Sequence, residues 1–254
     1  NRGQIEPARA DFEKSLQLEQ TERAAEWLAD LLLADATGWT VLTPGDMQSE
    51  GGAKLKLLPD GSILVSGRNP EQDRYTITTQ LPFERIRAFR LEAIPDPSLP
   101  SHGSGRHSNG NFILTEFQTA SGAAPVPLEE PWVTFTEHAE VGHIADGKPD
   151  EHWWSIYGKS SRRQAAYFAT DFAAARSEPL QITLDFRHSV FKQIGMGRFR
   201  LSVSEDPATI EYERKRLAAL KLTDPWLKLA AALHLAGDAD HLVDRTGRQT
   251  VRAR

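Results

Sequence analysis

The spacing of apolar residues changes twice along the chain. In residues 3–36 they recur every three or four positions, which predicts two amphipathic helices with a break near residues 19–21. The same period returns after Pro207, where Asp224 and Pro225 predict a helix start and Gly237 predicts its end. Between residues 38 and 204 the period is two, which is typical of strands with one buried face.

The central segment is expected to hold about eight to ten short strands. Asp60 and Gly61 separate two alternating runs, 53–58 and 62–67, and this pattern predicts a β-hairpin. The other predicted strands are 74–81, 86–94, 111–119, 132–137, 164–170, 180–188 and 197–204. No helical pattern separates them, so we expect a mainly β fold, an antiparallel β-sandwich of the jelly-roll type with helical flanks. The expected boundaries are helices in 1–37, the sandwich in 38–206 and helices in 207–254.

Composition narrows the classes of function. The 254 residues carry a net charge of −5, which argues against nucleic-acid binding because phosphates require a clustered basic surface. No apolar run is long enough to span a membrane, so we expect a soluble segment. The chain has no cysteine, which excludes disulfides, thiolate zinc sites and cysteine nucleophiles. Cytoplasm and periplasm both fit this composition. The chain opens without a methionine, and we expect it to be an excerpt of a longer protein.

Both flanks carry spacings found in helical repeats. Gly3, Ala8, Phe12 and Ser15 resemble the second helix of a tetratricopeptide repeat, with Ser15 where alanine is usual. A second spacing resembles the first helix and turn of the same repeat, and its residues are Trp226, Leu229, Ala230, Leu233, Gly237 and Leu242. Such repeats do not bury their faces alone, so the resemblance implies neighbouring repeats and protein partners bound through the helices. The alternative is a set of ordinary amphipathic flanking helices.

The stretch 143–158 contains Ala145, Asp146, Gly147 and then Trp153 or Trp154. This order resembles the discoidin-type signature of galactose-binding-like β-sandwiches. There the turn is chiefly structural: the aspartate bonds the turn backbone, the glycine accepts a positive φ, and the tryptophan packs across the end of the sandwich.

A second resemblance covers residues 89–118 and 197–207. Its pattern is Leu91–Glu92, a proline-rich kink at 95–100, the glycines Gly103 and Gly105, and Asn109–Gly110–Asn111–Phe112. It is similar to an uncharacterised β-sandwich of large planctomycete-type proteins, which often also contain tetratricopeptide repeats, protein-kinase domains or haem-binding modules. Ser104 stands where that family usually has proline. The resemblance implies no reaction.

The loop SHGSGRHSNGNF (101–112) has two interpretations. Asn109 and Gly110 predict a tight turn that feeds a strand beginning at Asn111. The functional interpretation is that the loop lines a ligand rim at one end of the sandwich, where Trp153 or Trp154 stacks on a sugar. The rim residues under this hypothesis are His102, Arg106, His107 and Asn109. The glycines do not form a dinucleotide fingerprint, because no helical pattern follows them.

The sequence offers weak metal and catalytic candidates. His138, His143, His152 and Asp146 are the one plausible metal cluster, but their spacing fits no helical zinc motif. We therefore expect no metal and no cofactor, although a structural calcium held by backbone oxygens stays open. Hydrolysis would need two carboxylates facing one cleft, and the acids within predicted strands are Glu92 and Glu116.

Three functional hypotheses follow. The leading one is a non-catalytic interaction or scaffolding module of a larger bacterial multidomain protein, in which a kinase or another catalytic domain lies elsewhere. The alternative is glycan binding through the loops at one end of the sandwich. The third is a hydrolase that uses Glu92 or Glu116. A G-x-S-x-G elbow is absent, and we expect no enzyme activity in this segment.

Overall fold

A computed structural model describes residues 22–34, 38–129, 131–137, 141–148, 152–173 and 178–238. The chain forms two compact units. One is Gly38–Pro207, and the other contains the helices that precede and follow it in the sequence.

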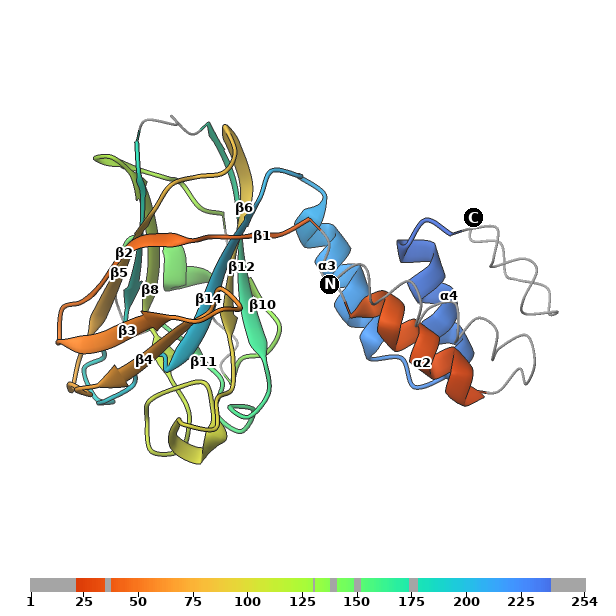
Figure 1. The fold of residues 1–254 in the computed structure, drawn as a ribbon, viewed down its shortest axis with the longest axis horizontal. Coiled ribbons are helices and arrows are strands. Elements are labelled where there is room, and N and C mark those ends of the chain that lie inside the picture. The colour runs from red at the N-terminus through yellow and green to blue at the C-terminus, as the bar shows by residue number, and fades with distance from the viewer. Residues whose placement is uncertain are drawn as a thin grey trace. The chain divides into compact units, whose positions relative to one another are not determined.

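The larger unit is built from two antiparallel sheets (Figure 1). Sheet A has the order β10 (Trp132–Val133), β12 (Gln164–Ala173), β6 (Arg85–Ala93), β14 (Arg198–Ser204), β4 (Ile63–Gly67) and β3 (Ala53–Leu57), and β1 (Thr40–Val41) also pairs with β14. Sheet B has the order β2 (Pro44–Ser49), β5 (Arg74–Thr79), β13 (Leu180–Asp185), β8 (Glu116–Ser121) and β9 (Ala124–Pro125). A separate ladder joins β7 (Ile113–Leu114) to β11 (Trp154–Ser155). The predicted antiparallel β-sandwich is confirmed.

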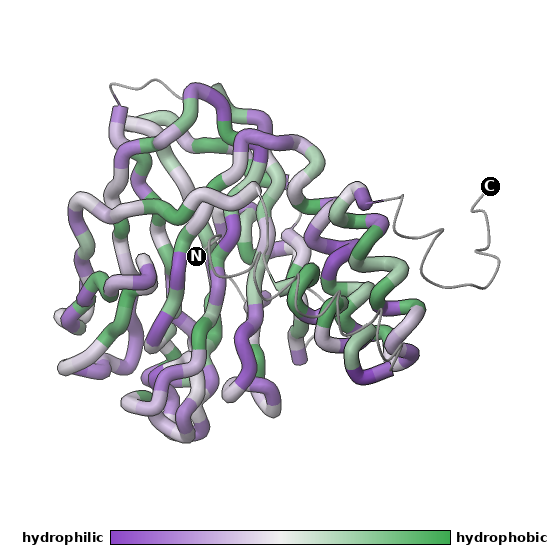
Figure 2. Tube along the Cα trace, turned by 45° about the vertical axis from the view of Figure 1, so that its right-hand side comes forward, coloured by the Kyte–Doolittle hydropathy of each residue, from purple (hydrophilic) through white to green (hydrophobic). Residues whose placement is uncertain are grey.

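Hydropathy alternates along the strands (Figure 2), and buried apolar residues from both sheets form one core cluster. On β14, Phe199, Leu201 and Val203 are buried in the core, while Arg198 and Arg200 lie on the other face of sheet A. Each buried phenylalanine stabilises the fold by about 2 kcal/mol through removal of apolar surface from water. The fully buried phenylalanines are Phe89, Phe112, Phe117, Phe168, Phe186 and Phe199.

Strand β2 was not expected from the sequence. Its residues PGDMQS show no apolar alternation, and the register shifts between Pro44 and Asp46. The strand is held by long-range contacts instead. Ser49 Oγ donates to Asp73 at 2.7 Å, and the Gly51 N–H donates to the same carboxylate at 2.8 Å. Tertiary pairing therefore overrides weak local propensity here.

The helical unit contains α2 (Glu22–Leu33), α3 (Thr209–Leu220) and α4 (Pro225–Leu235). Asp224 caps α4 by accepting the N–H groups of Trp226 and Leu227 at 2.9 Å, so the predicted helix start is confirmed. Gly237 follows the helix with a φ of 73°. The first predicted helix of the chain, with Gly3, Ala8, Phe12 and Ser15, lies outside the described residues, as does Leu242.

Small residues allow the helices of this unit to pack closely. The buried face of α2 carries three alanines and two leucines, and it packs with Leu229, Ala232 and Leu233 of α4. Arg216 of α3 donates to the Leu33 carbonyl at 2.6 Å, which satisfies an acceptor at the end of α2. Among the described helices, none has both the length and the apolar character that a bilayer crossing requires.

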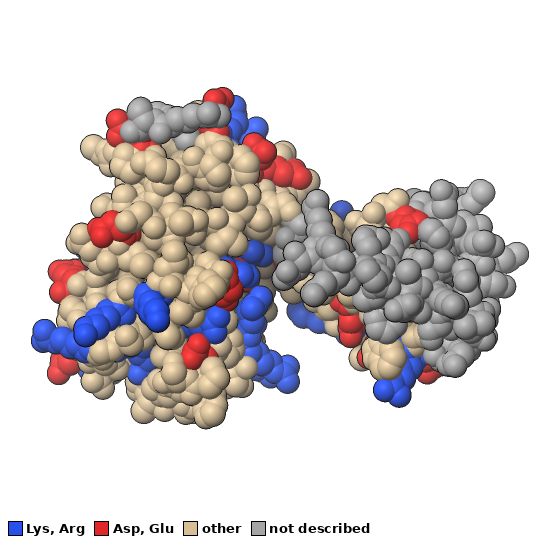
Figure 3. All heavy atoms as spheres, in the orientation of Figure 1, with Lys and Arg blue, Asp and Glu red and all other residues tan. Residues whose placement is uncertain are grey.

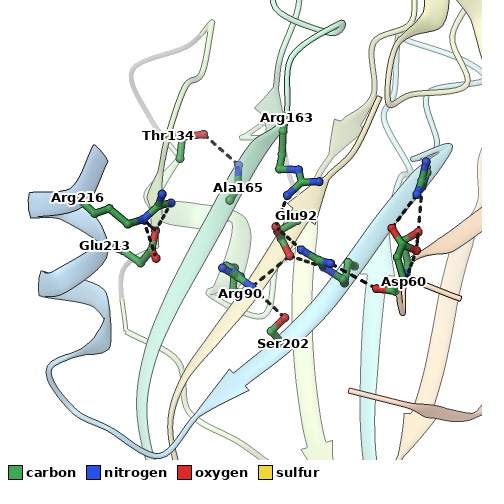
Figure 4. A network of polar contacts seen from close by, with 12 residues as sticks. Asp60, Arg90, Glu92, Thr134, Arg163, Ala165, Ser202, Glu213 and Arg216 are labelled. Carbon is green, nitrogen blue, oxygen red and sulfur yellow. Dashed lines mark hydrogen bonds and ion pairs between the residues drawn. The ribbon is translucent and has the colours of Figure 1, made fainter. Parts of the chain in front are cut away.

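A buried carboxylate joins the central strands of sheet A (Figure 4). Glu92 on β6 accepts two hydrogen bonds from Arg200 on β14, at 2.7 and 3.0 Å. Arg90 lies 3.3 Å and Arg163 lies 3.6 Å from the same carboxylate. Burial by itself raises the pKa of Glu92, but the hydrogen bonds from Arg200 and the charges of its neighbours outweigh burial and hold this pKa below its ordinary value.

A neighbouring arginine is fixed in the same way. Arg198 donates to Ser62 at 2.9 Å, to Asp96 at 3.0 Å and to Asp60 at 2.8 Å. Burial raises the pKa of Asp60, but hydrogen bonds from Ser62 and Arg198 lower it to about 2. These carboxylates therefore stay ionised at neutral pH and keep the guanidinium in place.

The Glu92 pair predicts a pH-dependent stability. Because its folded pKa lies below the unfolded value of ~4.3, the ionised side chain stabilises the fold above that pH, and this contribution disappears as the pH falls through the folded pKa. Glu92→Gln should cost about 3 kcal/mol at pH 7, since it leaves three arginines without their carboxylate. The difference from wild type should shrink below about pH 4. Urea unfolding at several pH values measures it.

Asp171→Asn provides the control on the same sheet. Asp171 is exposed, and it pairs with Arg85 and Arg87 where water screens the charges. This variant should lose far less stability at pH 7. Equal losses in the two variants would contradict a special role for the buried pair.

Candidate functional site

The glycine-rich loop is largely buried and packs against itself. A Cβ on Gly105 would lie 1.9 Å from the Asn111 carbonyl oxygen, and one on Gly103 would lie 2.4 Å from the Gly110 carbonyl oxygen. The Gly105 N–H donates to the Gly110 carbonyl at 2.9 Å. Gly110 has a φ of 78°, and Asn109 Oδ1 accepts the Asn111 N–H at 3.0 Å. The loop therefore folds back on itself, and the backbone at Gly103 and Gly105 packs directly against the backbone at Gly110 and Asn111.

Two of the predicted ligand residues instead serve the fold. Arg106 is buried, and its guanidinium donates to the carbonyls of Arg68 at 2.7 Å and Gly67 at 2.9 Å. Trp154 is fully buried, packs edge-on against Phe112, and donates to the Phe135 carbonyl at 2.9 Å. Neither side chain reaches a ligand at the surface, because each is used inside the sandwich. His102 is exposed on the 3-10 turn Pro100–His102, away from the pocket described below.

The Asp146–Gly147 turn lies against sheet B. Asp146 accepts the Lys148 N–H at 2.9 Å, and Gly147 has a φ of 84°. His143 lies 3.2 Å from Asp146 and stacks on His152 at 4.2 Å. Within the described ranges, no three metal-ligating side chains converge, and His138 lies outside them.

Glu92 and Glu116 lie in different sheets. Glu116 on β8 is buried, and it accepts the Gly147 N–H at 3.0 Å. It lines a groove of about 530 Å³ together with Gln118, Gln181 and Thr183. Glu92 lies on sheet A among arginines and does not line this groove. These two carboxylates therefore do not form the shared cleft that the hydrolase hypothesis requires.

A pocket of about 240 Å³ brings three of the predicted ligand residues together. They are the loop residues His107 and Asn109, together with Trp153. We call it the end pocket. Its remaining lining residues are Asn111, Ile113, Glu137, Ser155, Tyr157, Phe191 and Ile194.

Aromatic side chains dominate the accessible part of the end pocket. Tyr157 is 55% exposed and Phe191 is 46% exposed, which is high for rings of this size. Phe191 packs edge-on against Trp153 at 6.3 Å. His188 fixes this arrangement, because its Nδ1 accepts the Phe191 N–H at 3.1 Å and its ring meets the edge of Trp153 at 4.8 Å.

Polar groups surround these rings. Asn109 Oδ1 is used within the loop, by His107 at 2.7 Å and by the Asn111 N–H at 3.0 Å. In the described part of the chain, no contact uses Asn109 Nδ2 or His107 Nε2, so both remain for a ligand. Glu137 accepts a hydrogen bond from Ser155 Oγ at 3.1 Å. The pocket thus offers amide, imidazole and carboxylate groups beside apolar ring faces.

The end pocket lacks the geometry of nucleophilic catalysis. Ser155 Oγ is buried, donates to Glu137 and accepts from Asn111 Nδ2 at 3.0 Å. Among the described residues, no histidine lies within hydrogen-bond distance of this hydroxyl. A serine held in this way orients its neighbours, whereas a nucleophile needs an adjacent base.

Sequence reasoning missed Tyr157, Phe191 and Glu137. Alternation along residues 153–157 could have found Tyr157, because Trp153, Ser155 and Tyr157 line the end pocket while Trp154 and Ile156 do not. Phe191 lies in a loop without periodicity, and only tertiary structure brings it to the pocket.

No protein family matches the chain, and no curated protein is detectably similar to it.

The loop packing predicts a large effect of a single methyl group. Gly105→Ala should destabilise the protein by about 3 kcal/mol, because its Cβ meets backbone atoms that move only if the loop opens. Gly45→Ala is the control, since its Cβ would meet the Thr78 carbonyl oxygen at an ordinary 3.6 Å. Urea unfolding of both variants measures the difference. A Gly105→Ala protein as stable as Gly45→Ala would contradict the close packing.

Proposed function

We propose that the β-sandwich is a non-catalytic carbohydrate-binding module and that the end pocket receives the sugar. The observation that carries this proposal is the placement of three aromatic rings, Trp153, Tyr157 and Phe191, around one pocket with polar groups at its wall. Ring faces pack on the apolar faces of a sugar, while Asn109 and Glu137 supply hydrogen-bonding groups for its hydroxyls.

The size of the pocket favours a small ligand. Pockets for drug-sized molecules measure ~300–1,000 Å³, and the end pocket measures about 240 Å³. This volume suits one sugar ring at the end or along the side of a glycan. The remainder of a longer glycan would then lie on the surface beside the pocket.

The finer fold assignments belong to the same proposal. We propose that the sandwich is a jelly roll of the galactose-binding-like type, as the resemblance at residues 89–118 and 143–158 implies. The geometry of the Asp146–Gly147 turn supports it, because this turn accepts the Lys148 N–H and packs on sheet B through Glu116.

A separate role is proposed for the helical unit. Its helices, which we propose to be of the tetratricopeptide type, would bind protein partners in a larger scaffold. This proposal is supported by large apolar side chains left at the surface: Trp27 is 44% exposed and Leu227 is 60% exposed. Tryptophan is a typical anchor residue of protein interfaces.

Aromatic truncation tests the carbohydrate proposal. Tyr157→Ala and Phe191→Ala should each weaken glycan binding about tenfold, because each removes an aromatic contact of about 1–1.5 kcal/mol. Both side chains are exposed, so the unfolding temperature should stay close to that of the wild type. Calorimetric titration with the ligand found on a glycan array gives both the affinity and the stoichiometry.

Trp27→Ala is the matched control, since it removes an exposed ring from the helical unit. It should leave glycan affinity unchanged. A glycan array without any bound sugar would refute the proposed function, and so would glycan binding that survives the combined Tyr157→Ala and Phe191→Ala changes.

A peptide array tests the helical proposal in the same protein. Peptides that bind the wild type should bind Trp27→Ala at least fivefold more weakly, because truncation of an anchor ring costs ~1 kcal/mol or more. Tyr157→Ala should have no effect on them. Peptide binding that is unchanged in Trp27→Ala would show that Trp27 does not contact the peptide.

A further inference from the structure

The outer face of sheet A carries a local excess of positive charge. Strand pairing places Lys56, Leu64 and Arg198 in one row across β3, β4 and β14. The next row contains Arg200 and Glu92. Figure 3 shows Lys and Arg side chains gathered over these strands. We call this surface the basic face; its charged residues are Lys54, Lys56, Arg90, Arg163, Arg198, Arg200, Asp60, Glu92 and Asp96.

The net charge of this face is opposite in sign to the net charge of the chain. Six cations against three carboxylates leave a charge of +3, whereas the whole chain carries −5. Lys54 and Lys56 are exposed, and Arg163 is 57% exposed. A local positive field on an acidic protein is a feature that attracts anions to one particular surface.

Two arginines of this face, Arg198 and Arg200, keep part of their hydrogen-bonding capacity, and their side chains are 19% and 18% exposed. A guanidinium has five N–H donors. Arg200 uses three of them, on Glu92 and the Asp60 carbonyl, and Arg198 uses three, on Ser62, Asp60 and Asp96, so each keeps two. Because the carboxylates already fix both side chains, binding of an anion would cost little additional side-chain entropy.

A short exposed segment links the basic face to the end pocket. Tyr157 lines the pocket at one end of residues 157–163, and Arg163 contacts Glu92 at the other. Ser160 Oγ donates to the Asn109 carbonyl at 3.3 Å, which holds the segment against the pocket loop. Lys159 and Arg162 are exposed between these ends. Cationic side chains therefore continue from the pocket onto sheet A.

From this continuity we infer that the sandwich binds an anionic polysaccharide, with one sugar in the end pocket and the sulfate or carboxylate groups of the following sugars on the basic face. This inference rests on the proposed function, because the pocket provides the sugar contact. Nucleic acid is the other polyanion to consider. It is disfavoured, since the described part of the basic face has a charge of only +3 and phosphate backbones require more cationic contacts.

Binding of the full chain to immobilised polymers tests the inference. The probes are dextran, dextran sulfate, polygalacturonate and single-stranded poly(dT). Dextran sulfate should bind at least tenfold more tightly than neutral dextran, and its affinity should fall between about 50 and 200 mM NaCl. Polygalacturonate distinguishes carboxylate from sulfate as the recognised group.

A charge-matched pair of variants assigns the binding to the basic face. The combined change Lys54→Gln, Lys56→Gln and Arg163→Gln should weaken binding of the anionic polysaccharide about tenfold, since it removes three exposed charge contacts. The control combines Arg214→Gln, Lys215→Gln and Lys221→Gln on exposed positions of the helical unit. It changes the net charge equally and should alter affinity less than twofold.

The outcomes separate this inference from the proposed function. Neutral dextran binding as tightly as dextran sulfate, through Tyr157 and Phe191, would keep the carbohydrate pocket and overturn the anionic specificity. If binding of the anionic polysaccharide is lost in the basic-face variant but is unchanged in Tyr157→Ala and Phe191→Ala, the end pocket is refuted as its sugar site. Equal affinity of both charge variants, or tighter binding of poly(dT) than of either polysaccharide, would overturn the inference.

Discussion

The end pocket depends on one buried side chain, Asn111. Its Nδ2 donates to Ser155 Oγ at 3.0 Å, and its Oδ1 accepts the Ile156 N–H at 3.0 Å. These two hydrogen bonds join the glycine-rich loop to β11, so two segments more than forty residues apart form one wall. Buried amide pairs of this kind are costly to break, because both partners would lose their hydrogen bonds away from water.

The glycines of the loop make this bridge geometrically possible. Gly103 and Gly105 permit backbone contact with Gly110 and Asn111 at distances that no Cβ tolerates. Asn109, which belongs to this closely packed loop, lines the end pocket. The glycines therefore act as packing elements, and their number says nothing about phosphate binding. A rigid wall lowers the entropic cost of holding a weakly interacting ligand such as a sugar.

Prediction from the sequence succeeded where a residue's environment is set by its neighbours in the strand. The alternating runs gave the positions of β3, β4, β5, β6, β12, β13 and β14. Prediction failed where contacts with segments distant in the sequence determine the conformation or the position of a residue. β2 has no alternation and is held by Asp73, and Phe191 reaches the pocket through a loop that His188 caps. The pair Trp153 and Trp154 lies between these cases, because alternation separates them once β11 is recognised.

Arg106 shows why residue type alone misleads at a site. An arginine in a glycine-rich loop at the end of a sandwich has the chemistry of a ligand contact, yet it is buried and donates to the Gly67 and Arg68 carbonyls. On the outer face of sheet A, Arg198 and Arg200 instead lie on a strand, where Asp60 and Glu92 offset their charge and their side chains stay 19% and 18% exposed. A surface with more cationic than anionic side chains can attract an anion. A cation that is buried with its acceptors serves the fold instead.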